Sequence, residues 1–212
     1  MIKYQLKGTG LIKYHLGCDY FRDAHDSLCY APKKYTDKLI LDYVKLFGQK
    51  RKPYWSPLEH NNHLKIDNST ELDEKDIKSY QSMIGSLHGA VSLGRFDNST
   101  DAMTLSSFRS LPRQGHLQKA KQVYGYLSNF KDSTIRIRIG HPDYTGIKPN
   151  EYEWERSVYG KIREIIPVDK PKPLGKDVTL MTYVNANSYH DMITGRSLTG
   201  VLHLIKKTPF DW

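Results

Sequence analysis

Apolar residues recur at helical spacing through the middle of this chain, whereas they alternate or cluster as strands do near its two ends. Steps of three and four residues place apolar side chains on one face of a helix, and steps of two place them on one face of a strand. Helical and strand patterns therefore occupy separate stretches. This separation predicts an α+β fold in which a β-hairpin precedes a helical bundle and antiparallel strands follow it.

The opening stretch predicts a β-hairpin that ends near residue 30. Residues 11–23 are rich in aromatic and branched side chains, which favour strands. Residues 24–27 are polar and predict a turn, after which residues 28–30 begin the returning strand.

Two long helices are predicted next. The first begins after Pro32, which fits a first helical turn, and ends at Gly48, a residue typical of helix C-termini. The second begins at Asp73, and its Gly85 and Gly89 would let another backbone approach closely. The apolar stripe of the first helix is Tyr35, Leu39, Tyr43 and Phe47. The stripe of the second helix is Ile77, Tyr80, Ile84, Leu87 and Val91.

Two further helices complete the predicted bundle. We expect Thr100 or Asp101 to cap the third helix, which ends before Pro112. Its predicted apolar contacts are Met103, Phe108 and Leu111. The predicted apolar contacts of the fourth helix are Leu117, Ala120, Tyr124, Leu127 and Phe130. The other face of this helix shows Lys119, Lys121 and Gln122.

The last third of the chain returns to strand patterns. Residues 135–139 alternate between isoleucine and arginine, which predicts one buried and one basic face. A loop is predicted over residues 140–177, within which residues 151–166 have the pattern of a short helix. The later strands are a buried one at 178–184 and two more at 198–205 and 208–212. Because the chain stops inside the last strand, we expect a truncated domain.

Positive charge is concentrated in two stretches. The chain has a net charge of +9 and an isoelectric point near 9.3, which favours an acidic partner such as nucleic acid. The first stretch contains Lys33, Lys34, Lys38, Lys45, Lys50, Arg51, Lys52 and Lys65. The second contains Arg109, Arg113, Lys119, Lys121, Lys131, Arg136 and Arg138. Basic helices interleaved with tyrosines suit a phosphate backbone, and the alternative is a pair of solvated helix faces.

No local motif in the sequence predicts catalysis. His60 and His63 form a close pair, but no cysteine or carboxylate stands beside them at ligand spacing, so we predict no metal site. Strand alternation places Cys18 and His15 on opposite faces, which argues against a nucleophile and its base. No glycine-rich loop leads from a strand into a helix, so nucleotide-binding fingerprints are absent.

The sequence also predicts an intracellular protein, cytoplasmic or nuclear and not secreted. Its N-terminus has no apolar signal region, and no run is long enough to span a bilayer, so no membrane contact is expected. Cys18 and Cys29 are therefore expected to be free thiols.

Several short motifs, in one order from end to end, resemble the polyprotein of copia-type LTR retrotransposons. They match the C-terminal part of the reverse transcriptase and the start of RNase H. The motifs are LKGTG at 6–10, HLGCDYFRD at 15–23, PKKY at 32–35, SPL at 56–58, YQSMIGSL at 80–87, LGRFD at 93–97, YVNAN at 183–187 and TGRSLTG at 194–200. The match is weakest around residues 140–175.

The resemblance implies a role for each region. Residues 1–30 would be the palm-end primer-grip hairpin, in which Gly17 and backbone hold the primer terminus. Residues 31–131 would be the helical thumb and connection, 132–177 a strand and linker, and 178–212 a truncated RNase H-like meander. The implied partners are an RNA–DNA hybrid or template–primer duplex, bound by shape, and the palm domain that precedes this segment in the family. The implied nucleic-acid-binding residues are Gly17, Lys33, Lys34, Lys38, Lys50, Arg51, Lys52, Lys119 and Lys121.

The departures from the family concern its catalytic carboxylates. The polymerase aspartates belong to a Tyr-x-Asp-Asp motif that would lie before the first residue of this chain. The first RNase H carboxylate would occupy position 185, where this chain has Asn185, and the later ones would follow Trp212. The intact family enzyme implies Mg²⁺, which needs anionic oxygen ligands, so we expect no cofactor and no complete active site in this fragment.

Three hypotheses remain open at this stage. The chain is a non-catalytic remnant that binds hybrid, a piece of an enzyme active only when joined to an upstream palm, or a domesticated helical module for protein interaction without nucleic-acid function. The helix with Gly85, Gly89 and its apolar stripe would serve the third. We also expect poor solubility, because uncovered strand edges and apolar faces favour aggregation.

Overall fold

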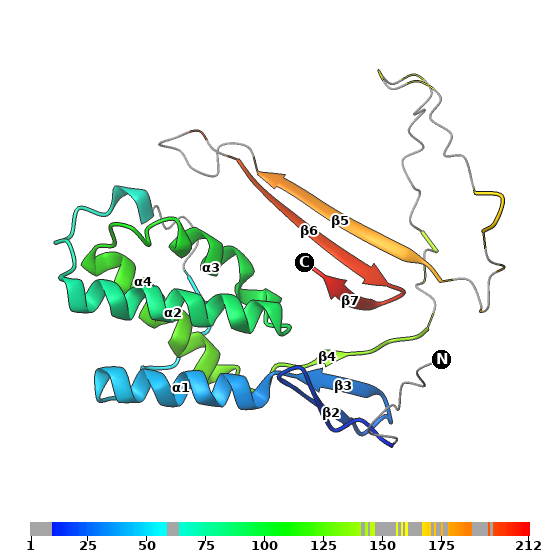
Figure 1. Ribbon diagram of the computed structural model, residues 1–212, viewed down its shortest axis with the longest axis horizontal. Coiled ribbons are helices and arrows are strands. Elements are labelled where there is room, and N and C mark those ends of the chain that lie inside the picture. The colour runs from blue at the N-terminus through cyan, green and yellow to red at the C-terminus, as the bar shows by residue number, and fades with distance from the viewer. Residues whose placement is uncertain are drawn as a thin grey trace, which may run out of the picture.

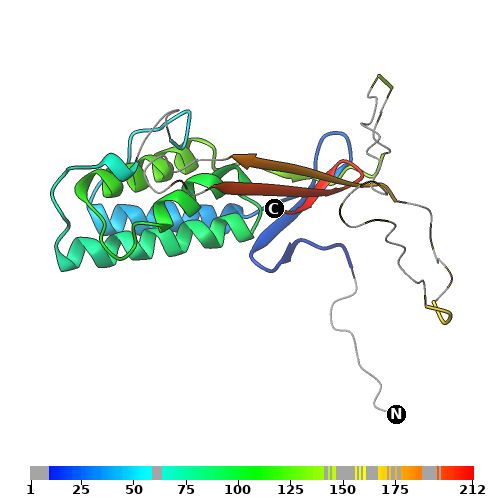
Figure 2. The same cartoon turned by 90° about the horizontal axis from the view of Figure 1, so that it is seen from above.

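The computed structural model describes residues 10–58, 64–140, 178–187 and 197–212, together with isolated positions between 143 and 175 and at 195. It confirms a mixed α+β fold: a sheet near the N-terminus, four helices, and a separate three-stranded sheet (Figure 1). Figures 1 and 2 both show the helices gathered at one end of the molecule and the strands toward the other. The pair His60 and His63 and most of the predicted helix at 151–166 lie outside the described residues.

The N-terminal sheet has four strands in sequential order. An extra turn divides the first half of the predicted hairpin into two strands, and the fourth strand comes from the segment after the helices. The strands are β1 (Tyr14–His15), β2 (Cys18–Arg22), β3 (Leu28–Ala31) and β4 (Ile135–Arg136). Leu16 and Gly17 both have positive φ, 46° and 87°, as a tight two-residue hairpin turn requires. The predicted hairpin with its turn at 24–27 is confirmed in β2 and β3, but the residues before that turn contain a second turn that was not predicted.

The pairing of β4 with β3 joins the two ends of the helical region. Cys29 lies opposite Arg136, Tyr30 lies opposite Ile135, and Ile137 donates its backbone N–H to Leu28. The alternation predicted over 135–139 holds for the first four residues, because Ile135 is buried, Ile137 is half-buried and both arginines are exposed. It fails at Ile139, which is 80% exposed beyond the sheet.

The two long helices form where the sequence predicts them. Helix α1 (Lys33–Phe47) follows Pro32 and ends at Gly48, whose φ of 72° and N–H bond to the Val44 carbonyl close the last turn. Helix α2 (Glu74–Ser92) begins at Asp73, whose carboxylate accepts a hydrogen bond of 2.7 Å from the backbone of Asp76.

The third helix differs from its prediction. A 3₁₀ turn, η2 (Phe96–Asn98), precedes α3 (Ser99–Ser106), so Asn98 rather than Thr100 or Asp101 stands at the N-cap. Met103 and Leu111 are exposed, contrary to prediction, while Ala102 and Leu105 are fully buried. Helix α4 (Gln114–Asn129) follows, and a short 3₁₀ turn, η1 (Leu64–Ile66), lies in the connection before α2.

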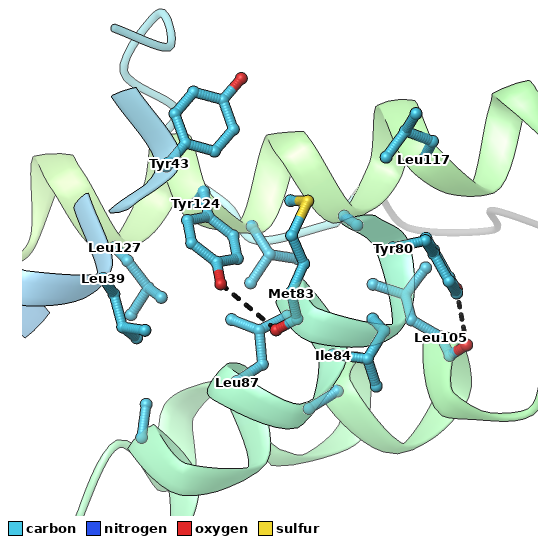
Figure 3. Close-up of a cluster of buried hydrophobic side chains, with 14 of the residues drawn as sticks. Leu39, Tyr43, Tyr80, Met83, Ile84, Leu87, Leu105, Leu117, Tyr124 and Leu127 are labelled. Carbon is cyan, nitrogen blue, oxygen red and sulfur yellow. Dashed lines mark hydrogen bonds between the residues drawn. The ribbon is translucent and has the colours of Figure 1, made fainter. Parts of the chain in front are cut away.

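The four helices enclose one hydrophobic core (Figure 3). The hydroxyls of two buried tyrosines donate hydrogen bonds to backbone carbonyls of helices. Tyr80 donates to the Leu105 carbonyl at 2.6 Å, and Tyr124 donates to the Met83 carbonyl at 3.2 Å. The predicted stripe of α2 packs here, with Tyr80, Ile84 and Leu87 fully buried. The other face of α4 is largely covered, because Gln122 is buried and Lys119 and Lys121 are half-buried.

The close approach predicted at the α2 glycines involves a side chain and occurs at Gly89 alone. The Tyr35 hydroxyl fills the space of the missing Cβ and donates a 3.1 Å hydrogen bond to the Ser86 carbonyl. Gly85 is exposed, with no atom within 4 Å of the position of a Cβ.

The C-terminal sheet is an antiparallel meander of β5 (Leu180–Asn187), β6 (Leu198–Ile205) and β7 (Thr208–Asp211). It meets the rest of the chain through Thr208, which accepts from the Arg138 backbone, and through Trp212, whose indole N–H donates to the Val91 carbonyl at 3.0 Å. The prediction of a buried strand at 178–184 was wrong. Leu180 and Val184 are 65% and 63% exposed, because β5 contacts mainly β6 and, in the part of the chain that the structure describes, the faces of this strand are largely uncovered.

Candidate nucleic-acid interface

The segment after α1 returns along the surface of α4. Helices α1 and α4 pack in opposite directions: Lys121 lies over the Phe47 ring near one end, and Lys33 meets Asp132 at the other. Residues 50–55, called here the return segment, run beside α4 between these two ends. The Tyr54 backbone N–H donates to the Gly125 carbonyl at 3.5 Å, and the Asn129 amide donates to the Tyr54 carbonyl at 3.1 Å.

Gly125 allows this packing because it has no side chain. A Cβ there would collide with the Lys52 carbonyl oxygen and lie 2.7 Å from the Tyr54 ring. The return segment, which contains three of the predicted binding residues, is therefore seated on α4 by backbone contacts.

Four predicted binding residues meet at this place: Lys50, Arg51, Lys52 and Lys121, called here the α1–α4 basic cluster. Lys50 and Lys52 are exposed, whereas Arg51 is half-buried and donates to the Tyr54 hydroxyl at 3.2 Å. Lys121 lies 4.0 Å above the Phe47 ring. Burial lowers the pKa of Lys121 and nearby Arg51 adds to that effect, while Asp76 opposes it. Lys50 and Lys52 are thus the members best placed to meet a phosphate.

A shallow pocket lies between α1 and α4 beside the cluster. It is lined by Ile40, Tyr43, Val44, Lys50, Arg51, Tyr124 and Ser128. The pocket is too small to be a ligand site by itself, so binding at this place would occur on the surface.

The cations at the start of α1 are balanced by carboxylates from other elements. Lys33 pairs with Asp132 at 2.8 Å, and this contact raises the pKa of Lys33. Lys34 pairs with Asp19 at 3.2 Å and lies 4.4 Å from the Tyr14 ring centre. Exposed ion pairs of this kind are worth about 0–1 kcal/mol, so a phosphate can compete for either lysine. The local net charge is nevertheless lower than the run of lysines suggests.

The remaining predicted binding residues are spread over the molecule. Lys38 is exposed on α1, one turn after Lys34. Lys119 is half-buried on α4 and interacts with other groups of the chain. Gly17 lies at the β1–β2 turn, where a Cβ would come within 3.1 Å of Leu93. The absence of a side chain at Gly17 therefore lets the hairpin turn pack on the end of α2.

The residues considered for catalysis are not assembled into a site. Within the described ranges, no three His, Cys, Asp or Glu side chains are grouped as a metal site would need. Asn185 is exposed on β5, opposite Gly200 of β6. Its amide side chain has no anionic oxygen to offer a metal ion.

Cys18 and His15 do not lie on opposite faces of a strand, as strand alternation predicted. The extra turn pairs these two residues across β1 and β2, so they share a face of the sheet. Cys18 is buried, its thiol donates to the Leu93 carbonyl at 3.3 Å, and burial raises the pKa of the thiol. A thiol kept protonated in this way is a poor nucleophile.

The LGRFD motif has a structural role. Arg95 is 1% exposed and donates from Nε and Nη2 to the two carboxylate oxygens of Asp97, at 3.0 and 2.8 Å. The Tyr126 hydroxyl donates to the same carboxylate at 3.0 Å. This motif thus ties η2 to α4.

Sequence reasoning missed the residues that support the basic cluster. Gly125, Asn129 and Tyr54 position the return segment, and Trp55 extends from it into solvent. The available signal was the run Lys50-Arg51-Lys52, followed after one proline by two aromatic residues. Basic and aromatic side chains in one segment are typical of single-strand nucleic-acid binding.

Comparison with known proteins gives one relative. Over 138 residues the chain is 28% identical to a Saccharomyces cerevisiae protein named "Putative transposon Ty5-1 protein"; the match covers 65% of this chain and 43% of that protein. The chain is thus similar to a transposon-related protein and matches less than half of its length. No protein-family model and no solved structure matches the chain. No helix among the described residues is long and apolar enough to cross a membrane.

Proposed function

We propose that this chain is the template–primer-holding part of a copia-type retrotransposon reverse transcriptase, and that it binds RNA–DNA hybrid through the phosphate backbone without catalysing a reaction by itself. The observation that carries the proposal is the α1–α4 basic cluster, in which exposed Lys50 and Lys52 stand on a segment fixed by backbone contacts. Similarity to a transposon protein supports the same origin.

The arrangement of elements is consistent with the roles that the resemblance implies. The sheet of β1 to β3 would be the primer grip, the helices α1 to α4 the thumb and connection, and β5 to β7 the first strands of an RNase H-like domain. The palm would be a protein partner of this segment. The cluster lies on helices and their connection, which suits contact with the phosphates of an A-like duplex by shape.

The proposal assigns no catalytic residue to this chain. Two-metal hydrolysis needs carboxylates that hold two Mg²⁺ ions together, and position 185 has an amide in place of the first one. The alternative, a protein-interaction module, relied on the apolar stripe of α2. Tyr80, Ile84 and Leu87 of that stripe are fully buried inside the bundle, and Ile77 and Val91 are partly buried against it, so little of the stripe is open to a partner.

Salt-dependent binding of a hybrid tests the proposal. The full chain is titrated with a fluorescent RNA–DNA hybrid at several salt concentrations, alongside the double variant Lys50→Glu/Lys52→Glu. We expect this variant to weaken binding by about tenfold or more at low salt, and to reduce the slope of log affinity against log salt by about 2.

The matched control is Lys75→Glu/Lys78→Glu, which changes the net charge equally at exposed positions of α2 outside both basic stretches. This control should keep most of the affinity. Equal losses in the two double variants would mean that only overall charge matters, and an absence of binding by the natural chain at low salt would end the proposal.

A further inference from the structure

Trp55 is the most exposed large aromatic side chain in the return segment. Its side chain is 84% exposed, although tryptophan is usually well buried in folded proteins. Among the residues that the structure describes, the indole makes one ring contact, with Phe130. The two ring centroids are 5.8 Å apart and the rings lie at 71° to one another. Most of the indole surface is therefore open to a ligand.

The residue before Trp55 is held on three sides. Tyr54 donates its backbone N–H to Gly125, accepts on its carbonyl from Asn129, and accepts on its hydroxyl from Arg51. Because this backbone is already ordered, stacking of a ligand on the indole would not lose the conformational entropy of ordering the segment.

Exposed lysines lie on the two segments that meet at this indole. Lys50 and Lys52 are exposed earlier in the return segment, and exposed Lys131 directly follows Phe130. The nearby carboxylate of Asp132 is paired with Lys33. An exposed aromatic ring on a segment with exposed lysines is the combination that binds single-stranded nucleic acid, since bases stack on the ring and phosphates pair with the cations.

We propose that Trp55 is a stacking platform for an unpaired base of a nucleic acid whose phosphates pair with Lys50, Lys52 and Lys131. The chain would then prefer a hybrid with a single-stranded extension to a blunt hybrid. This inference rests on the proposed function, since phosphate binding by the basic cluster brings the strand to Trp55. A protein partner or a second copy with an apolar surface fits three exposed lysines less well.

Three labelled probes test the stacking: a blunt RNA–DNA hybrid, the same hybrid with a short single-stranded extension, and the single strand alone. Binding to the full chain is measured by fluorescence anisotropy for the natural sequence, Trp55→Ala and Trp55→Phe. Phe210→Ala is the matched control, because Phe210 is an exposed aromatic residue on β7, outside the return segment and the α1–α4 basic cluster. We expect Trp55→Ala to bind the extended hybrid and the single strand about tenfold more weakly, with blunt-hybrid affinity unchanged.

Tryptophan emission and oligomeric state give independent readouts. The extended hybrid should quench the emission of the natural chain, and Trp55→Phe should lose this quench while keeping most of the affinity. Equal losses on all three probes, or none, would overturn the stacking role while leaving hybrid binding intact. A dimer that Trp55→Ala converts to a monomer in light scattering would also overturn it, and failure of the natural chain to bind any probe would refute the proposed function itself.

Discussion

Substituting two helical glycines by alanine should have opposite effects on stability. Gly85 of α2 is exposed, with no atom within 4 Å of the position of a Cβ. Alanine there gains helix propensity alone, so Gly85→Ala should stabilise the chain by about 0.5–1 kcal/mol. Gly125 of α4 has the same intrinsic propensity to gain, but the return segment occupies the space that a methyl group would need.

The cost at Gly125 follows from what the methyl group would displace. It would collide with the Lys52 carbonyl and approach the Tyr54 ring to 2.7 Å, and overpacking of this kind costs about 1–3 kcal/mol. Moving the segment also breaks the Asn129 to Tyr54 hydrogen bond, worth about 1 kcal/mol. After the gain in propensity, Gly125→Ala should destabilise the chain by about 1–3 kcal/mol.

Urea unfolding followed by far-ultraviolet circular dichroism measures both variants against the natural chain. The two free energies of unfolding should differ by about 2–4 kcal/mol, the sum of one gain and one loss. In addition, Gly125→Ala should weaken hybrid binding, because it moves Lys50 and Lys52, whereas Gly85→Ala should not. Stabilisation of similar size in both variants would refute the seating of the return segment on α4.

Three further predictions concern buried polar groups. Tyr80→Phe should cost about 0.5–1.5 kcal/mol in urea unfolding, because it removes the hydrogen bond to the Leu105 carbonyl, which still accepts from the Phe108 backbone N–H; a cost near zero would contradict the core geometry. Burial raises the pKa of Asp101 from 3.8 to about 6, so folding favours the protonated carboxyl. The contribution of this group to the free energy of unfolding is therefore complete below pH 3.8 and is lost as pH rises through about 6. Asp101→Asn should therefore raise stability by about 1–2 kcal/mol at pH 8 and by almost nothing at pH 3.5, in melts at both pH values. Cys18 and Cys29 should not react with a thiol reagent in the native chain and both should react in denaturant; fast native labelling would argue against their burial.

The helices could be predicted from sequence because their signals are local. Gly48, Asp73 and the stripe of α2 each act within a few residues of where they stand, and each does what its pattern predicts. The turn at Leu16 and Gly17 was missed because leucine at positive φ is not a turn signal. That turn is formed because it places Cys18 and Gly17 against Leu93, a contact between distant segments.

The candidate site was predictable in its residue types but not in its balance of charge. The run of lysines indicated a basic surface, yet the partners of Lys33 and Lys34 come from other elements, Asp132 and Asp19. Likewise, nothing local marks Gly125 as the seat of the return segment. Contacts of this kind depend on how elements pack, which a pattern within one element does not contain.

The pairing of β3 with β4 has a consequence for how the chain acquires its structure during synthesis. Tyr30 meets its partner Ile135 only after the whole helical region between them has left the ribosome. At about 5–20 residues per second, the free edge of β3 waits on the order of 5–20 s for its neighbour. Helices close through local contacts much faster than this. The bundle can therefore fold first and bring β4 next to β3. The pairing of these two strands then completes the sheet after the helices have formed.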